Sequence, residues 1–257
     1  LWDEASRGFE AYKTYWQNHS YFGPGTIYVE DPQTAAQIFN GNLTYNKAGW
    51  VVHMLRGVMG DSLFFESLKS YGYNDSLAYS DVTTEDFKNV CEDISGLDLS
   101  NFFEQWIYNE YYPQYGLLWD LNEVGELIIT IHQLQTWQYF DMPIDIKVVL
   151  NNESLFFRVN NQFQTEEYNL GYINGIPLFV QLDPDGWILK EIQYLNNDNI
   201  VPELSNILVY PAYPNPFNPE VTFKYFLPTR FGEIQSEIYI YDLKGKLIDK
   251  IGSGKSK

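Results

Sequence analysis

The sequence holds few side chains that bind metals or act as nucleophiles, with three histidines and one cysteine among 257 residues. A zinc site of the His-Glu-x-x-His type needs two imidazoles one helical turn apart, with a glutamate between them as general base. His19, His53 and His132 are too far apart for that motif, and none is followed by glutamate. The alternative is a site built from distant residues, such as His19 with His53. By default, we expect no metal within this chain.

The single cysteine, Cys91, falls in an apolar pattern with Phe87, Val90 and Ile94. In such a position cysteine behaves as a small hydrophobic residue. One cysteine also rules out a disulfide within the chain. We therefore expect Cys91 to be buried in a core rather than to act as a nucleophile.

The segment from Tyr45 to Arg56 carries a phenol, a lysine, a histidine and an arginine at the start of a predicted helix. A phenol is a neutral hydrogen-bond donor at ordinary pH, and a tyrosine that is suitably placed can stabilise a developing negative charge. The alternative is that Tyr45 packs the helix start, as one of 21 tyrosines. Arg56 either approaches a substrate carboxylate or pairs with Asp61, and we favour the pair.

Composition excludes several functions. The formal net charge is -18, which is unsuited to nucleic acid, because phosphates require clustered lysine and arginine. No apolar run is long enough to span a bilayer, and no signal segment opens the chain. The chain begins without methionine in what already reads as helix, so we expect a fragment of a longer protein.

The first part of the chain, residues 1–112, has a helical pattern. Thr83 with Asp86 three residues later forms a predicted capping box, and Gly96 is a predicted helix stop. The predicted helices are 2–17, 47–59, 62–71, 84–94 and 99–108.

From Pro113 the apolar pattern alternates with a period of two, which indicates strands. The predicted strands are 127–131, 144–149, 155–159 and 178–182, and their spacing favours a β-sandwich over residues 113–193. Aromatic residues on this sandwich would suit carbohydrate binding, but they are favoured in any strand, and we treat them as structural. Residues 194–207 are a predicted linker, and a last β-module over 208–257 has predicted strands at 221–226 and 237–241.

Three blocks of the sequence carry a resemblance to a known family. They run from Tyr45 to Asp61, from Thr83 to Tyr108 and from Leu182 to Lys190. In content and order they resemble the membrane alanyl aminopeptidase family, the gluzincin zinc aminopeptidases. Ala48-Gly49 reverses the family's usual Gly-Ala order. Both residues are small, so we expect the close approach of helices to be kept.

The resemblance implies a helical C-terminal lobe of a thermolysin-like catalytic domain, followed by an immunoglobulin-like β-sandwich. It implies that Tyr45 is the catalytic tyrosine whose hydroxyl binds the oxyanion opposite the zinc. It also implies that the full-length protein binds zinc through ligands upstream of residue 1, so this chain alone binds no cofactor. Glu4 is an alternative zinc ligand, which we reject because the segments 8–13 and 21–25 fit the region after the family's ligand helix better.

The segment from Tyr213 to Pro219 reads Tyr-Pro-Asn-Pro-Phe-Asn-Pro. Together with the strands after it, this segment resembles the C-terminal sorting domain of the type IX secretion system, in a shortened form. The alternative is any proline-rich linker to a β-module. The resemblance implies a partner in the type IX secretion machinery, and location outside, or on the surface of, a Gram-negative bacterium.

Taken together, the sequence predicts a multidomain α + β protein. The function that it favours is the C-terminal part of a secreted zinc metallo-aminopeptidase acting on peptides, inactive as an isolated chain. One alternative is a non-catalytic surface or binding protein with a relic peptidase lobe. Another keeps the zinc lobe but changes the reaction, as in a relative that hydrolyses epoxides.

Overall fold

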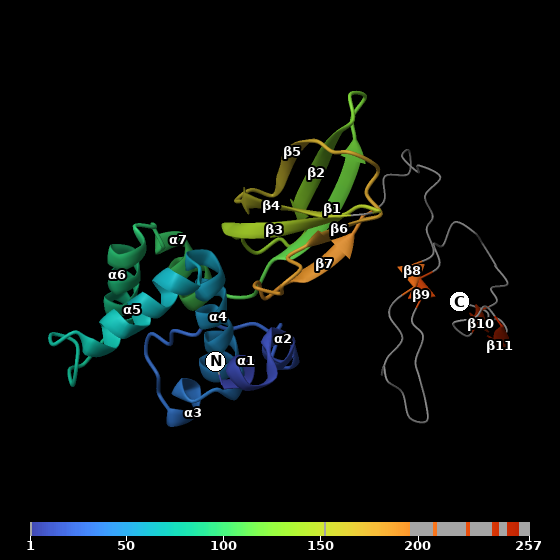
Figure 1. The fold of residues 1–257 in the computed structure, drawn as a ribbon. Coiled ribbons are helices and arrows are strands. Elements are labelled where there is room, and N and C mark those ends of the chain that lie inside the picture. Colours follow the sequence, from blue (N-terminus) through green and yellow to red (C-terminus); the bar gives the residue numbers. More distant parts are fainter. Residues whose placement is uncertain are drawn as a thin grey trace. The chain divides into compact units, whose positions relative to one another are not determined.

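The computed structural model describes residues 2–151, 153–195, 208–209, 225–226, 238–241 and 246–251. The chain divides into two compact units, Leu1–Ile200 and Val201–Lys257. The first unit contains helices followed by strands (Figure 1). The prediction of a mixed α and β protein is confirmed.

The helices of the first unit end at Tyr108. The predicted helix over 2–17 is interrupted at Gly8, whose φ of 85° lies outside the helical region, so two helices form instead of one. Two short elements between 35 and 47 were not predicted. The observed helices are α1 (Trp2–Arg7), α2 (Phe9–Asn18), α3 (Ala35–Ile38), η1 (Gly41–Lys47), α4 (Ala48–Met59), α5 (Asp61–Tyr73), α6 (Thr84–Ser95), α7 (Ser100–Phe103) and η2 (Glu104–Tyr108), where η marks a π-helix.

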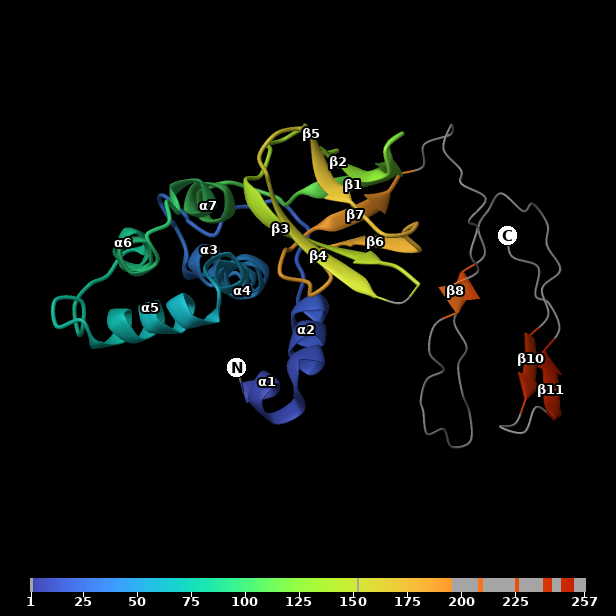
Figure 2. The same cartoon turned by 45° about the horizontal axis from the view of Figure 1, so that its top comes forward.

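Helix α6 begins and ends where the sequence predicts. The Asp86 backbone N–H donates to Thr83 Oγ1 at 3.3 Å, and the Thr83 N–H donates to Asp86 Oδ2 at 2.8 Å, so each residue caps the other. Gly96 adopts the left-handed conformation, with φ 70°, and its N–H closes the helix on Glu92 O. Helices α5 and α6 pack side by side, away from the strands (Figure 2).

The strands of the first unit form two sheets. A four-stranded sheet has the order β5-β2-β1-β7, and a three-stranded sheet has the order β4-β3-β6. Within them β1 pairs with β7 in parallel, while the other pairs are antiparallel. The strands are β1 (Gln114–Leu121), β2 (Glu126–Gln133), β3 (Met142–Val149), β4 (Ser154–Asn161), β5 (Thr165–Tyr172), β6 (Phe179–Leu182) and β7 (Glu191–Tyr194).

The central strands follow the alternation that predicted them. Leu127, Ile129 and Ile131 of β2 are fully buried, as are Ile144 and Ile146 of β3. Fully burying such a side chain contributes about 1.5–3 kcal/mol, so these two strands supply much of the core. The unpredicted strands β1, β5 and β7 lack this clean alternation: β1 holds consecutive apolar residues, and β5 is mostly polar.

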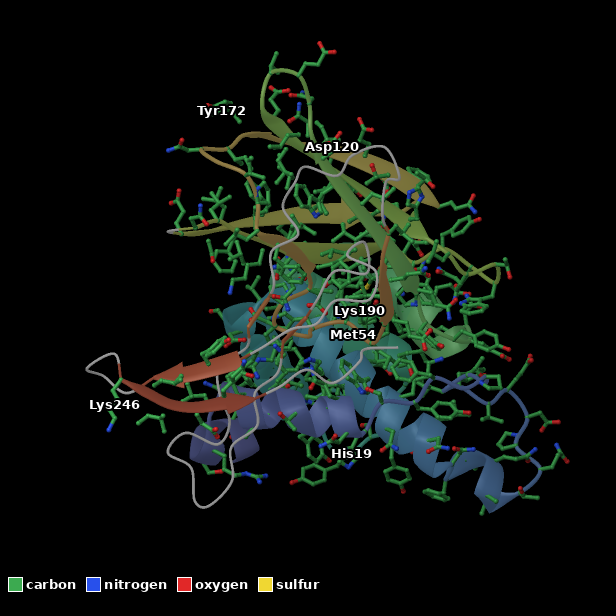
Figure 3. The ribbon with its side chains drawn as sticks, turned by 90° about the vertical axis from the view of Figure 1, so that its right-hand side faces the viewer. His19, Met54, Asp120, Tyr172, Lys190 and Lys246 are labelled. Atoms are coloured by element: carbon green, nitrogen blue, oxygen red, sulfur yellow. The ribbon has the colours of Figure 1, made fainter. Side chains whose placement is uncertain are left out.

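Helix α4 packs against the turn that follows β6. The backbone N–H of Leu189 donates to the sulfur of Met54 at 3.4 Å, and Figure 3 shows Met54 beside Lys190, the next residue in this turn. A Cβ on Gly57 would lie 3.0 Å from Trp187, so only glycine fits without movement there. On the strand side, Arg158 donates to Gly57 O at 2.6 Å.

The described residues of the second unit form two short antiparallel strand pairs. Strand β8 (Leu208–Val209) pairs with β9 (Tyr225–Phe226), and β10 (Ile238–Tyr241) pairs with β11 (Leu247–Ile251). Strands β9 and β10 lie within the predicted strands at 221–226 and 237–241. Most of the predicted linker and the segment Tyr213 to Pro219 lie outside the described residues.

The close approach predicted at Ala48-Gly49 is a contact between Gly49 and Trp16 of α2. A Cβ on Gly49 would lie 2.8 Å from two ring carbons of Trp16. We expect Gly49→Ala to lower the free energy of unfolding by about 1 to 3 kcal/mol, because this rigid ring must move. Urea denaturation would measure the change.

Gly72→Ala is the matched control, since a Cβ there meets nothing within 4 Å and Gly72 lies in helix α5. It should keep or raise stability, because alanine favours helix over glycine. Equal effects of the two substitutions would contradict the packing argument.

Candidate functional site

Tyr45 lies in η1, the π-helical turn that leads into α4. The side chain of Asn40 starts this turn by accepting hydrogen bonds from the N–H groups of Asn42 at 2.9 Å and Leu43 at 3.1 Å. Single π-helical turns are rare and occur frequently at functional sites. The sequence predicted the helix only from Lys47, so this turn and its geometry were missed.

The side chain of Tyr45 is 60% exposed. Its hydroxyl makes no hydrogen bond to any residue that the structure describes. Most exposed tyrosines share this property, but Tyr45 is also held on a turn whose backbone is fixed on both sides. The Tyr45 hydroxyl is therefore free to donate a hydrogen bond to a molecule that binds at this surface.

Lys47, two residues after Tyr45, points the opposite way, into the protein. Its side chain is 1% exposed, and Nζ donates to the carbonyl oxygens of Gly25 and Asn109, each at 3.1 Å. Burial lowers the pKa of Lys47 to about 8, with the nearby Glu110 acting in the opposite direction. A lysine in this segment was noted from the sequence, but its burial was not predicted, since lysine is rarely buried and the apolar pattern gives no sign of it.

His53 lies inside a cage of aromatic rings. Trp16 and Trp187 stack on its two faces, with centroid distances of 5.5 and 4.8 Å, and Tyr12 and Trp50 meet it edge-on. Its Nε2 lies 3.1 Å from Gly186 O and its Nδ1 lies 2.8 Å from the Tyr12 hydroxyl. A carbonyl only accepts, so we assign the proton to Nε2 and the acceptor role to Nδ1. Both nitrogens are engaged within the protein.

Burial lowers the pKa of His53 to about 4, and the hydrogen bond to Gly186 O offsets only part of this effect. The charged imidazolium is disfavoured because burial in the cage removes it from solvent. His53 therefore joins α2, α4 and the turn after β6 as a neutral group. The sequence had left open a metal site of His19 with His53, and these contacts give His53 another role.

Arg56 pairs with Asp61, as the sequence favoured, and also with Glu4, which was missed. Its guanidinium donates to both oxygens of Glu4, at 2.6 and 2.9 Å, and to both oxygens of Asp61, at 2.7 and 3.0 Å. These hydrogen bonds raise the pKa of Arg56, and the same bonds lower the pKa of Glu4 and Asp61. With its donors occupied by protein carboxylates, Arg56 has a structural role.

The other candidate side chains lie apart from one another. His19 Nδ1 is bonded to Tyr15 O, and His132 Nδ1 to Thr165 Oγ1. Cys91 is fully buried, and burial raises the pKa of its thiol to about 11, which suits the predicted core role. Across the described ranges, no three His, Cys, Asp or Glu side chains are placed to hold a metal ion.

The helical part of the chain matches a known family of domains. Residues 10–106 match the Peptidase family M1 domain. This match supports a relationship between residues 10–106 and the M1 aminopeptidase family. The matched residues include Tyr45, Lys47, His53 and Arg56, so the resemblance to an aminopeptidase family that the sequence suggested is supported for this segment.

Curated relatives that are named as aminopeptidases agree with this match. The chain is 31% identical over 85 residues to aminopeptidase N of Lactococcus lactis subsp. lactis, which covers 33% of this chain and 10% of that protein. It is 33% identical over 76 residues to aminopeptidase M1-D of Oryza sativa subsp. japonica, covering 30% of this chain and 8% of that protein. The aligned part therefore spans about a tenth of these relatives.

A solved structure extends the likeness of fold beyond the M1 match. Aminopeptidase A of Legionella pneumophila, in complex with aspartic acid, superposes with a TM-score of 0.65 at 15% identity, covering 76% of this chain and 22% of that chain. At this identity the superposition shows the fold alone.

We expect His53 to make stability depend on pH between about 6.5 and 4. Its folded pKa of about 4 lies below the ordinary histidine value of 6.5, so in this range the unfolded chain takes up a proton that the folded protein does not. The free energy of unfolding should therefore fall as pH falls, by about 3 kcal/mol from this residue. His53→Gln keeps a donor and an acceptor but cannot titrate.

Urea denaturation of both proteins at several pH values would measure this contribution. Carboxylates titrate in both proteins, so the difference between them isolates His53. That difference should be constant from pH 7 to 9 and change below pH 6.5. A constant difference at all pH values would show that His53 does not resist protonation.

Proposed function

We propose that this chain is part of a metallo-aminopeptidase that hydrolyses N-terminal residues from peptides, and that Tyr45 is a catalytic residue of that enzyme. The observation that carries the proposal is the placement of Tyr45. Its hydroxyl is exposed on an anchored π-helical turn within residues 10–106, the segment that matches the M1 domain. The peptidase names of the relatives support the reaction class.

Peptide hydrolysis passes through a tetrahedral intermediate whose oxygen carries negative charge. A fixed neutral donor lowers the barrier, because it stabilises that charge without reorganising as the charge develops. In the proposed mechanism the Tyr45 hydroxyl donates a hydrogen bond to this oxygen. Its proton is retained by the phenol, so Tyr45 acts as an electrostatic stabiliser.

The proposed enzyme uses zinc, but the described residues of this chain do not fit a zinc site. His19 and His132 each have one ring nitrogen bonded within the chain, and His53 has both. The carboxylate of Glu4 is bonded to Arg56. We therefore assign the zinc ligands to the full-length protein upstream of residue 1. By this proposal the isolated 257 residues are inactive.

Tyr45→Phe in the full-length protein tests the proposal, because it removes only the hydroxyl. We expect kcat on amino-acid p-nitroanilides to fall by roughly 100-fold to 1,000-fold, the loss typical of one oxyanion donor. KM and zinc content should change little, since neither depends on this hydroxyl.

Tyr73→Phe is the matched control, since Tyr73 is 80% exposed at the end of α5, and it should leave kcat unchanged. Wild-type turnover in Tyr45→Phe would refute the catalytic role. Absence of both zinc and peptidase activity in the unaltered full-length protein would favour a binding protein with a relic peptidase lobe.

We also propose that residues 208–257 direct secretion through the type IX machinery to the surface or exterior of a Gram-negative bacterium. The support is the Tyr-Pro-Asn-Pro-Phe-Asn-Pro segment from Tyr213 to Pro219 and the alternating residues that follow it. Fusing residues 208–257 to a reporter in a bacterium with this machinery should place the reporter outside the cell. Residues 113–193 fused in the same way are the control. Retention of both fusions inside the cell would refute the proposal.

A further inference from the structure

Lys47 is a buried lysine whose role the proposed mechanism does not use. Removing an ammonium group from water costs several kcal/mol, and an apolar side chain of similar volume usually fills such a place at no loss of stability. Here the group stays at 1% exposure, where Nζ donates to Gly25 O and Asn109 O. Because burying the Lys47 ammonium group costs free energy, we look for a contribution of this side chain other than stability.

The two acceptors of Lys47 belong to segments far away in the sequence. Gly25 lies in the loop between α2 and α3, and Asn109 directly follows η2. The same two segments are joined by the N–H groups of Ile27 and Tyr28, which both donate to Ile107 O at 3.1 Å. Lys47 therefore connects η1 by hydrogen bonds to two segments that are also hydrogen-bonded to each other.

The loop around Gly25 also lies directly on η1. Gly25 has a φ of 109°, and a Cβ there would lie 2.7 Å from Leu43 Cδ1, a side chain of η1. On the other side of Tyr45, the Asn40 side chain holds the first N–H groups of the turn. The segment 41–47 is thus tied at its start by Asn40 and at its end by Lys47.

A π-helical turn needs such ties, because its wider backbone spacing is uncommon and seldom extends beyond one turn. The N–H of Ala48 donates to Leu43 O, five residues back, which is the bond that defines this spacing. If the turn relaxed to α-helical spacing, the residues on it would rotate about the helix axis. The hydroxyl of Tyr45 would then move by more than the tolerance of an oxyanion donor.

We propose that Lys47 is a positioning residue for Tyr45: its buried ammonium group, bonded to Gly25 O and Asn109 O, fixes the π-helical turn that aims the Tyr45 hydroxyl at the reacting carbonyl. This inference rests on the proposed catalytic role of Tyr45. Lys47 itself touches no substrate, and acts only through the backbone of the turn.

A double-mutant cycle in the full-length protein tests the proposal. Lys47→Met keeps the length of the side chain and removes its donors. We expect kcat on amino-acid p-nitroanilides to fall roughly tenfold to 100-fold with KM nearly unchanged, the size typical of a misplacement of about 1 Å. In a Tyr45→Phe background, Lys47→Met should change kcat by less than about twofold, because the hydroxyl that it positions is already absent.

A merely structural role predicts a different outcome. It would lower kcat by the same factor in both backgrounds, in step with the fraction of folded protein, and this result would overturn the proposal. Lys69→Met, at an exposed lysine of α5, is the matched control and should leave kcat unchanged. If Lys47→Met does not fold, Gly25→Ala displaces one acceptor of the same lysine and should give the same non-additive cycle.

The test separates this inference from the proposed function. If Tyr45→Phe alone leaves kcat unchanged, the catalytic role of Tyr45 fails, and the positioning role fails with it. If Tyr45→Phe lowers kcat while Lys47→Met does not, only the positioning role is overturned.

Discussion

A side chain that can carry charge is tolerated in a protein core only when its polar atoms are paired, and this constraint organises the helical part of the molecule. Helix α4 and the turn before it bring three such side chains inside: Lys47, His53 and Arg56. Each is paired by segments distant in the sequence, and these partners include Asn109, Gly186 and Glu4. Because unpaired groups would be costly, the three pairings fix where the surrounding loops and helices lie against α4.

The turn before α4 has one exposed face and one buried face. Tyr45 is directed outward and Lys47 inward, with one residue between them. A loop residue that must act on a substrate is useful only if the backbone beneath it is rigid, and rigidity requires contacts on the hidden side. At the buried end of the turn these contacts run from the Lys47 side chain to backbone carbonyls of the neighbouring segments. The geometry therefore depends on the path of the neighbouring segments more than on their residue types.

Much of the fold was predictable from local patterns, and much of the site was not. The capping box at Thr83 and the apolar alternation around Ile129 and Ile144 are signals that lie within a few consecutive residues. The sequence therefore predicted the helix and the two strands that contain them. The pairing of Arg56 with Glu4 joins residues 52 positions apart, and the hydrogen bond between His53 and Gly186 O joins residues 133 positions apart. No periodicity carries that information. The π-helical spacing at Tyr45 likewise depends on tertiary bonds, and propensity alone gives an ordinary helix start.

The parallel pairing of β1 with β7 covers one side of β1 and makes β7 an edge strand of the four-stranded sheet. The backbone bonds from Glu191 to Pro113 and from Leu195 to Leu117 bracket this pairing, which brings the last strand of the first unit beside its first strand. Any shorter piece that stops before Glu191 leaves one side of β1 as a bare edge with unpaired N–H and C=O groups. Such edges recruit strands from other chains. Truncations of this protein should therefore be designed to retain residue 195, and shorter ones will tend to aggregate for topological reasons.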